Sequence, residues 1–306
     1  MWGRAWHAAP MQSDDGLRGL MTVSGETARL VRRRGARAEH VRLRRGAYVG
    51  AAHWASLTAD ERHLVRVEAV AAACTDPVFS HWSAAAVWGL PTVGRPDESV
   101  HVSIPAAGGG RSQGDVVRHA TRVPIEPERR GGMFVTGVAR TVVDLARAGG
   151  LACGLVAADA AVRAGLVDQE ALAIEAERAG AGRGSRAARA VVVHADGRSE
   201  SPGESLSRAR MIEHGLPVPV LQHELRDERG FVGRVDFWWP AAGVVGEFDG
   251  RVKYGLDERT AADAVWSEKK REDRIRAVVT GFARWTWDDA WRGGAMVAAL
   301  RRAGVR

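Results

Sequence analysis

GRVDFWWP at residues 233–240 and VVGEFDG at residues 244–250 are the stretches that decide the fold of the last third of the chain. Each has the apolar character and the alternation of a β-strand, and the short interval between them predicts a hairpin. Asp236 lies in the first strand, and alternation puts Glu247 and Asp249 on one face of the second. Because carboxylates in such apolar strands need a compensating charge, the hairpin predicts a cation site.

The residues around this hairpin predict an α-β-β-β-α-β order. The expected elements are a helix from 202 through 213, strands at 218–225, 231–239 and 243–249, a helix at about 261–279 and a strand at 283–287. A turn at 227–230 joins the first two strands. We therefore expect the chain to end in an α/β domain.

Three acidic residues are candidates to share one metal ion: Glu204 in the first of these helices, Asp236 and Glu247. Carboxylate oxygens are the ligands that Mg²⁺ and Mn²⁺ prefer. A bound ion of this kind activates water and stabilises charge on a phosphodiester. The alternative is that the acids pair with Arg234, Arg251 or the Lys and Arg side chains of the next helix, in a domain that folds but is inert.

Residues 198–306 resemble the PD-(D/E)XK nuclease superfamily, specifically the Vsr-like endonuclease-related domains of bacteria. The resemblance implies a restriction-endonuclease-like fold, with Asp236, Glu247 and Glu204 as metal ligands and DNA phosphodiesters as the substrate. The superfamily has a Lys two residues after the strand acid, where this chain has Asp249. Asp249 is then expected to assist the metal-binding acids. Lys269 in the following helix, or Lys253 just beyond the strand, is expected to replace the missing catalytic Lys.

The N-terminal region predicts a DNA-binding winged helix-turn-helix. A helix is expected at 24–35, followed by a hairpin at 40–49 that bends at Gly46. Positions 29 to 45 hold eight arginines and one acid, Glu39, which is the charge pattern of a phosphate-binding surface. The residues expected to contact DNA are Thr27, Arg29, Arg32, Arg33, Arg34, Arg42, Arg44 and Arg45.

The middle of the chain predicts a mixed α/β domain without a catalytic motif. Helices are expected at 60–74, 80–90, 137–148 and 155–165, and strands at 100–104 and 114–119. His81 and Ser83 lie in a Trp- and Ala-rich helix, which favours packing over catalysis. Cys74 and Cys153 are both expected to be buried. The expected domains are thus residues 1–55, 56–197 and 198–306.

Residues 17–49, which end in LRRGAYV, resemble the winged helix of AbiEi-type antitoxins from type IV toxin-antitoxin systems. SHWSAAAVWGL at 80–90 and VARTVVDL at 138–145 are similar to the α/β domain that follows the winged helix in that family. The resemblance implies transcriptional control as a role and a cognate toxin as a partner.

The chain of 306 residues has a formal net charge of +7 and a pI of about 10.3, with far more Arg than Lys. This balance favours double-stranded DNA as a partner. The sequence has no apolar run that predicts a membrane span and no secretory signal pattern, so we expect a cytoplasmic protein. Two functions stay open: a Mg²⁺- or Mn²⁺-dependent DNA endonuclease, and an AbiEi-like repressor with a catalytically inert nuclease fold.

Overall fold

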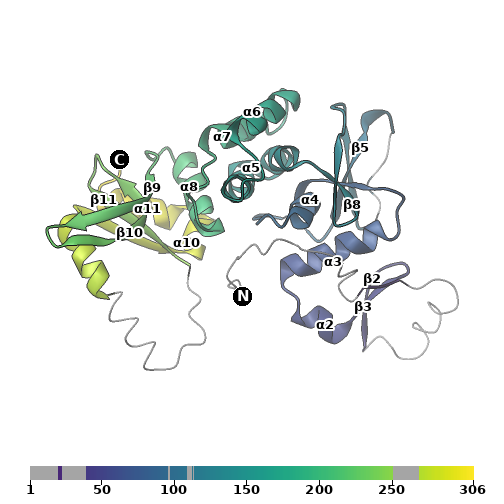
Figure 1. Cartoon of the computed structure of the whole chain (residues 1–306), viewed down its shortest axis with the longest axis horizontal. Coiled ribbons are helices and arrows are strands. Elements are labelled where there is room, and N and C mark those ends of the chain that lie inside the picture. Colours follow the sequence, from purple (N-terminus) through teal and green to yellow (C-terminus); the bar gives the residue numbers. More distant parts are fainter. Residues whose placement is uncertain (1–19, 23–38, 96, 109–111, 113, 251–268) are drawn as a thin grey trace.

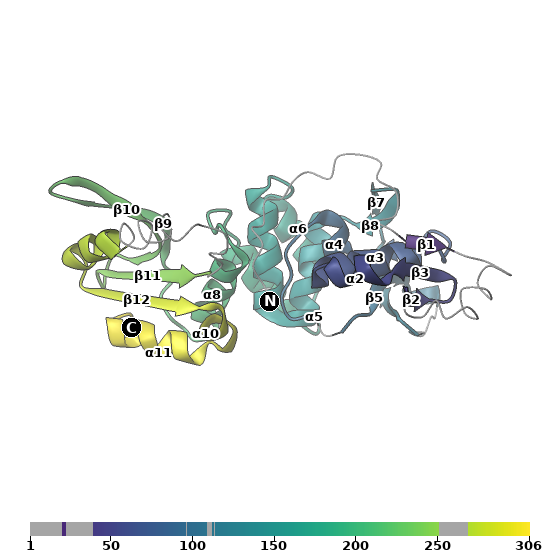
Figure 2. The same cartoon turned by 90° about the horizontal axis from the view of Figure 1, so that it is seen from below.

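The computed structural model describes residues 20–22, 39–95, 97–108, 112, 114–250 and 269–306. These residues form a mixed α/β structure with three sheets, which confirms the expected class. The N-terminal hairpin and the C-terminal sheet lie at opposite ends, with a helical layer between them (Figures 1 and 2). The described chain is therefore arranged around three sheets in series.

The N-terminal sheet has three strands in the order β1-β3-β2: β1 (Leu20–Thr22), β2 (His40–Arg44) and β3 (Ala47–Gly50). The predicted hairpin is confirmed, and Gly46 has the positive φ of 83° that its bend requires. Strand β1 was not predicted, and its pairing with β3 makes the hairpin part of a sheet. The helix predicted at 24–35 lies outside the described residues.

Two helices follow the hairpin, α2 (Ala51–Ser56) and α3 (Ala59–Ala71). Thr58 caps α3 in a reciprocal box with Glu61, which satisfies backbone groups at the start of the helix. Helix α3 begins one residue before the predicted start at 60 and ends three residues before the predicted end at 74. Cys74, however, lies beyond the helix and is exposed, so its expected burial is wrong.

A five-stranded sheet of order β6-β5-β4-β8-β7 forms the centre of the middle region. Its strands are β4 (Val78–Phe79), β5 (Val100–Pro105), β6 (Val116–Thr121), β7 (Pro127–Arg130) and β8 (Met133–Thr136). Helix α4 (His81–Trp88) packs on it and ends at Gly89, which is left-handed as predicted for a C-terminal glycine. The short helix η1 (Ala106–Gly108) follows β5.

Helix α5 (Val138–Arg163) spans both helices predicted at 137–148 and 155–165, with one non-helical residue, Gly150, between its two parts. Helices α6 (Gln169–Arg178) and α7 (Ser185–His194) pack beside it. Cys153 is buried as predicted, and its thiol donates to the carbonyl of Val93. Among the described residues, α5 is long and apolar enough to span a membrane, yet 67% of its apolar window is buried, as in a core helix.

The C-terminal elements follow the predicted α-β-β-β-α-β order. They are α8 (Pro202–Glu213), β9 (Val220–Asp227), β10 (Gly230–Trp239), β11 (Val244–Asp249), a helix described over 269–278, and β12 (Gly281–Thr286). The sheet order is β12-β11-β10-β9, and β12 runs parallel to β11. Two further helices, α10 (Trp287–Arg292) and α11 (Gly294–Ala303), were not predicted.

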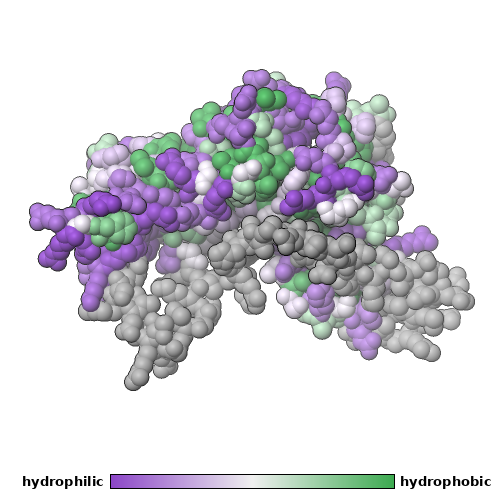
Figure 3. Space-filling view, in the orientation of Figure 1, coloured by the Kyte–Doolittle hydropathy of each residue, from purple (hydrophilic) through white to green (hydrophobic). Residues whose placement is uncertain are grey.

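One apolar core runs from the middle helices into the C-terminal sheet. Leu155 of α5, Leu206 of α8 and Phe237 of β10 are fully buried members of it. Hydrophilic side chains dominate the face in Figure 3, while apolar ones gather near its middle, around α5. The boundary placed at residue 198 therefore separates elements that share a core.

Candidate functional site

Four polar residues form one row across the C-terminal sheet, one from each strand. The register of β9 and β10 puts Gln222 opposite Asp236. The register of β10 and β11, continued by one residue, puts Asp236 opposite Glu247, and β11 pairs Glu247 directly with Arg284 of β12. The predicted hairpin thus brings Asp236 and Glu247 together as expected, flanked by an amide and a guanidinium.

Glu204 reaches this row from the first turn of α8. Ser201 caps the helix by accepting from Glu204 N at 3.2 Å, and its hydroxyl donates to Glu204 Oε1 at 2.7 Å. The amide of Gln222 donates to Glu204 Oε2 at 3.0 Å and lies 3.5 Å from Asp236 Oδ1. Gln222 therefore bridges two of the three predicted metal ligands.

Asp236 is a buried carboxyl group with two other acids beside it. Burial, together with the neighbouring carboxylates of Glu204 and Glu247, raises its pKa to about 7, although Phe248 N donates to Asp236 Oδ2 at 2.8 Å. Burial also raises the pKa of Glu204. Near neutral pH the charge of Asp236 is therefore only partly compensated by its surroundings.

Glu247, in contrast, is held by two arginines. Arg271 Nη2 donates to its Oε1 at 2.9 Å and Arg284 Nη2 to its Oε2 at 2.6 Å. Arg284 also contacts Glu272 at 3.1 Å. This is the pairing expected if the acids have a structural role: Arg271 belongs to the following helix, whose Lys and Arg side chains are among the expected partners, whereas Arg284 of β12 is not.

The acids fit a divalent cation in part. Glu204 and Asp236 supply hard oxygen donors of the type that Mg²⁺ and Mn²⁺ prefer, and a bound cation would stabilise the charged form of Asp236. Gln222 presents its amide nitrogen to both acids, so its oxygen would join them only after the amide turns over. Within the described ranges, however, no three His, Cys, Asp or Glu side chains are grouped so as to hold one ion. Glu247 differs from the other two predicted ligands, because both of its carboxylate oxygens accept from arginines.

The predicted positive partners differ from those observed. Lys269, the expected catalytic replacement, is exposed in the helix described over 269–278, and Lys253 lies outside the described residues. Asp249 is half-buried at the end of β11. The sequence pattern does not single out Gln222 or Arg284, and it includes Arg271 only as one of the Lys and Arg side chains of the helix after β11.

The predicted DNA-contacting residues are only partly described. Arg42 and Arg45 are exposed at the hairpin and Arg44 is half-buried, and Arg42 Nε donates to the carbonyl of Arg44 at 3.3 Å. The remaining candidates lie outside the described residues: Thr27, Arg29, Arg32, Arg33 and Arg34. The described part of the hairpin thus presents guanidinium groups to solvent.

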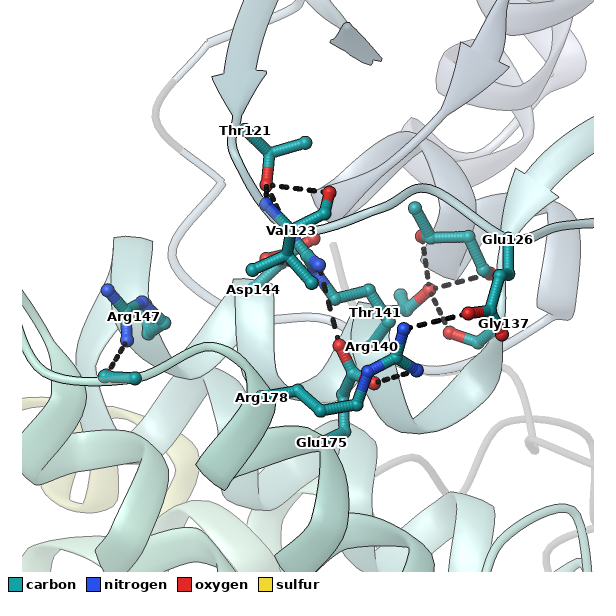
Figure 4. Close-up of polar contacts among 12 residues, drawn as sticks. Thr121, Val123, Glu126, Gly137, Arg140, Thr141, Asp144, Arg147, Glu175 and Arg178 are labelled. Carbon is teal, nitrogen blue, oxygen red and sulfur yellow. Dashed lines mark hydrogen bonds and ion pairs between the residues drawn. The ribbon is translucent and has the colours of Figure 1, made fainter. Parts of the chain in front are cut away.

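The middle region holds a separate polar cluster centred on Arg140 of α5 (Figure 4). Arg140 donates to Asp144 Oδ1 at 2.9 Å, to Glu175 Oε1 at 3.4 Å and to Thr121 Oγ1 at 3.3 Å. Burial raises the pKa of Asp144 to about 6. These contacts join α5, α6 and β6, so the cluster has an evident structural role.

Three histidines stack beside this cluster. The rings of His81 and His119 lie 3.7 Å apart between centroids, and His101 Nδ1 lies 2.8 Å from His119 Nε2. Burial lowers the pKa of all three, that of His101 to about 4. His81, at 4.0 Å from Asp144, has the left-handed φ of 51°. The helix of His81 is a packing helix as predicted, but its first residue belongs to a polar layer.

Comparison with known proteins shows similarity to sequences from Mycobacterium tuberculosis. Two uncharacterized proteins, from strains CDC 1551 / Oshkosh and ATCC 25618 / H37Rv, are each 36% identical to the chain over 128 residues. The alignment covers 42% of the chain and 47% of each relative, so the chain spans about half the length of the curated relatives it matches. No family model and no solved structure matches it.

Proposed function

We propose that the chain binds double-stranded DNA in the cytoplasm and hydrolyses its phosphodiesters with a divalent metal ion, Mg²⁺ or Mn²⁺. The observation that carries this proposal is Asp236, whose pKa of about 7 reflects a carboxyl group buried beside two other acids. Such an arrangement is costly unless a cation binds to it. The α-β-β-β-α-β order and the sequence resemblance to PD-(D/E)XK nucleases support the same proposal.

Glu204 and Asp236 would hold the ion, joined by the oxygen of Gln222 once its amide turns over and by Glu247 after release from an arginine. A bound Mg²⁺ or Mn²⁺ supplies an activated water and charge neutralisation at the phosphate. Arg271 and Arg284 are part-exposed, at 29% and 32% of the side chain, and so are able to reach a DNA phosphate with charge-assisted hydrogen bonds. A DNA phosphate would then be a further partner of Arg271 and Arg284 besides the acids that they contact.

The hairpin arginines Arg42, Arg44 and Arg45 support DNA binding at the other end of the chain. Exposed guanidinium groups bind DNA phosphates without sequence specificity. This binding depends on salt concentration because it releases counterions from the DNA. DNA binding and cleavage are thus assigned to different sheets.

Plasmid cleavage tests the proposal. The wild type is compared with Asp236→Asn and Glu204→Gln over a range of Mn²⁺ and Mg²⁺ concentrations, with Glu224→Gln as a matched control on the exposed side of β9. We expect cleavage by the wild type and the control, and a loss of more than about 100-fold in the two site variants. Equal cleavage by all four proteins would point to a contaminating nuclease and contradict the assignment.

A second candidate function is supported by the pairing of Glu247 with Arg271 and Arg284 and by Asp249 in place of the motif Lys. In that case the C-terminal sheet is a scaffold, and the chain is an AbiEi-like repressor with a cognate toxin as partner. Salt-dependent DNA binding without metal-dependent cleavage, in the same wild-type preparation, would favour this candidate over the nuclease.

A further inference from the structure

A cavity of about 920 Å³ lies between the N-terminal hairpin and the five-stranded sheet, far along the chain from the acid row. Its described walls come from β2 and the bend after it, from the segment that follows α3, and from β5 and β6. Cavities of about 300–1,000 Å³ are the usual size for small-molecule sites. A DNA duplex lies across a surface and does not enter a hollow of this size.

Four arginines line the cavity: Arg42, Arg44, Arg45 and Arg118. Within the described part of the chain none of them forms a salt bridge, although Asp76 and Asp115 line the same cavity. Arg44 Nη1 is buried and has no hydrogen-bond partner among the described residues. Four guanidinium groups that line one cavity, none of them in a salt bridge among the described residues, favour an anion with several oxygens, such as a phosphate chain.

Much of the remaining wall is apolar. Leu43, Val70, Val102 and Ile104 line it, and Val102 lies directly opposite Arg118 in the register of β5 and β6. A bare phosphate would leave this apolar surface unused. A ligand that combines a flat, weakly polar ring system with phosphates would cover the apolar wall and reach the arginines at once.

We propose that this cavity binds a nucleoside phosphate. The base covers the apolar wall of β5 and α3, and the phosphates accept from the hairpin arginines and from Arg118. Because the ligand then joins the hairpin to the sheet, its binding fixes the hairpin and engages Arg42, Arg44 and Arg45. The nucleotide would then compete with DNA for these arginines. This competition rests on the proposed DNA binding, whereas the nucleotide site itself does not.

Cys74 provides the test, since it is exposed and lines the cavity. Cys153 is buried, and burial raises its thiol pKa to about 11, so it reacts slowly. The full chain is treated with N-ethylmaleimide in the presence of ATP, GTP, AMP, GMP, tripolyphosphate or duplex DNA, and alkylation of Cys74 is followed by mass spectrometry. We expect at least one nucleotide to slow the reaction saturably, without any requirement for metal or for cleavage activity.

The matched variants are Arg118→Ala, which removes a cavity guanidinium from β6, and Arg122→Ala, which removes an exposed arginine just beyond the same strand. We expect the protecting nucleotide to bind about tenfold or more weakly to Arg118→Ala and unchanged to Arg122→Ala. Protection that persists in Arg118→Ala, no protection by any nucleotide, or equal protection by tripolyphosphate would overturn the proposal. Protection by DNA alone would also overturn it and assign the cavity to DNA.

Discussion

Arg208 of α8 donates to Asp159 of α5 at 2.6 Å, and the two side chains are only 3% and 1% exposed. Asp159 also accepts from the backbone of Asp196, while Arg208 donates to the carbonyl of His194. Burial nevertheless raises the pKa of Asp159 to about 6. This ion pair joins the middle helices to the C-terminal sheet inside one core, at the place where the sequence predicts a domain boundary.

We expect Arg208→Met to lower the free energy of unfolding by about 3–5 kcal/mol, because it leaves the charge of Asp159 buried without its partner. Adding Asp159→Asn to this variant removes the stranded charge and should recover a large part of the loss. Urea denaturation at pH 7.5 measures both, with Arg189→Met in α7 as an exposed control. A double variant no more stable than Arg208→Met would show that the pair is not the link.

We expect Asp236→Asn to stabilise the metal-free protein. A carboxyl group whose folded pKa of about 7 exceeds its unfolded value of 3.8 contributes stability at low pH, and this is lost as the pH rises through 7. The gain from the substitution should therefore be about 2–3 kcal/mol larger at pH 8 than at pH 5. Denaturation in EDTA at the two pH values measures it, and equal gains at both would contradict the buried-acid interpretation.

The sequence predicted the backbone of the acid row better than its chemistry. Strand alternation and one hairpin were enough to bring Asp236 beside Glu247, because register follows from local pattern. Gln222 was missed because it lies in a strand with an ordinary polar pattern, and only the three-dimensional register turns it toward Glu204. Glu247 pairs with Arg271 and not with Lys269 because of how the helix is rotated about its axis, and the spacing of apolar residues in the sequence does not determine that rotation.

In the middle region, the sequence predicts the helices but not the polar residues that the fold brings together. His81, His101 and His119 are far apart in the chain and match no motif, so only the sheet brings them together. The predicted break between two helices near Gly150 was correct in position, but the chain continues through it as α5. Helices α5 and α8 share one core, although the Gly- and Ser-containing segment at 196–203 has the composition of a linker.

The stacked histidines should make stability fall in mild acid. A base whose folded pKa is below its unfolded value of 6.5 contributes stability above about pH 6.5, and this is lost as the pH falls toward 4, the folded pKa of His101. We expect His101→Asn to remove about 2 kcal/mol of the difference in stability between pH 8 and pH 5. An unchanged difference, measured by denaturation in matched buffers, would mean that His101 is protonated without penalty.

Gly203 is the position where a single methyl group should disturb the acid row. It precedes Glu204 in α8, and a Cβ there would lie 2.0 Å from Cζ of Phe248, the neighbour of Glu247. We expect Gly203→Ala to cost about 1–3 kcal/mol through overpacking. Since Phe248 N also binds Asp236, displacement of its ring should weaken the stabilisation that Mn²⁺ gives, measured as the shift in melting temperature.

Gly294→Ala is the control for this change, because a Cβ at the start of α11 meets nothing within 4 Å and Gly294 does not have a positive φ. It should be neutral, or stabilise the chain by about 0.4–1 kcal/mol through the entropy of the unfolded state. If Gly203→Ala lowered stability but left the Mn²⁺ shift at the wild-type value, Phe248 would be a packing residue only. The path from α8 through Phe248 to Asp236 would then have no part in binding the metal.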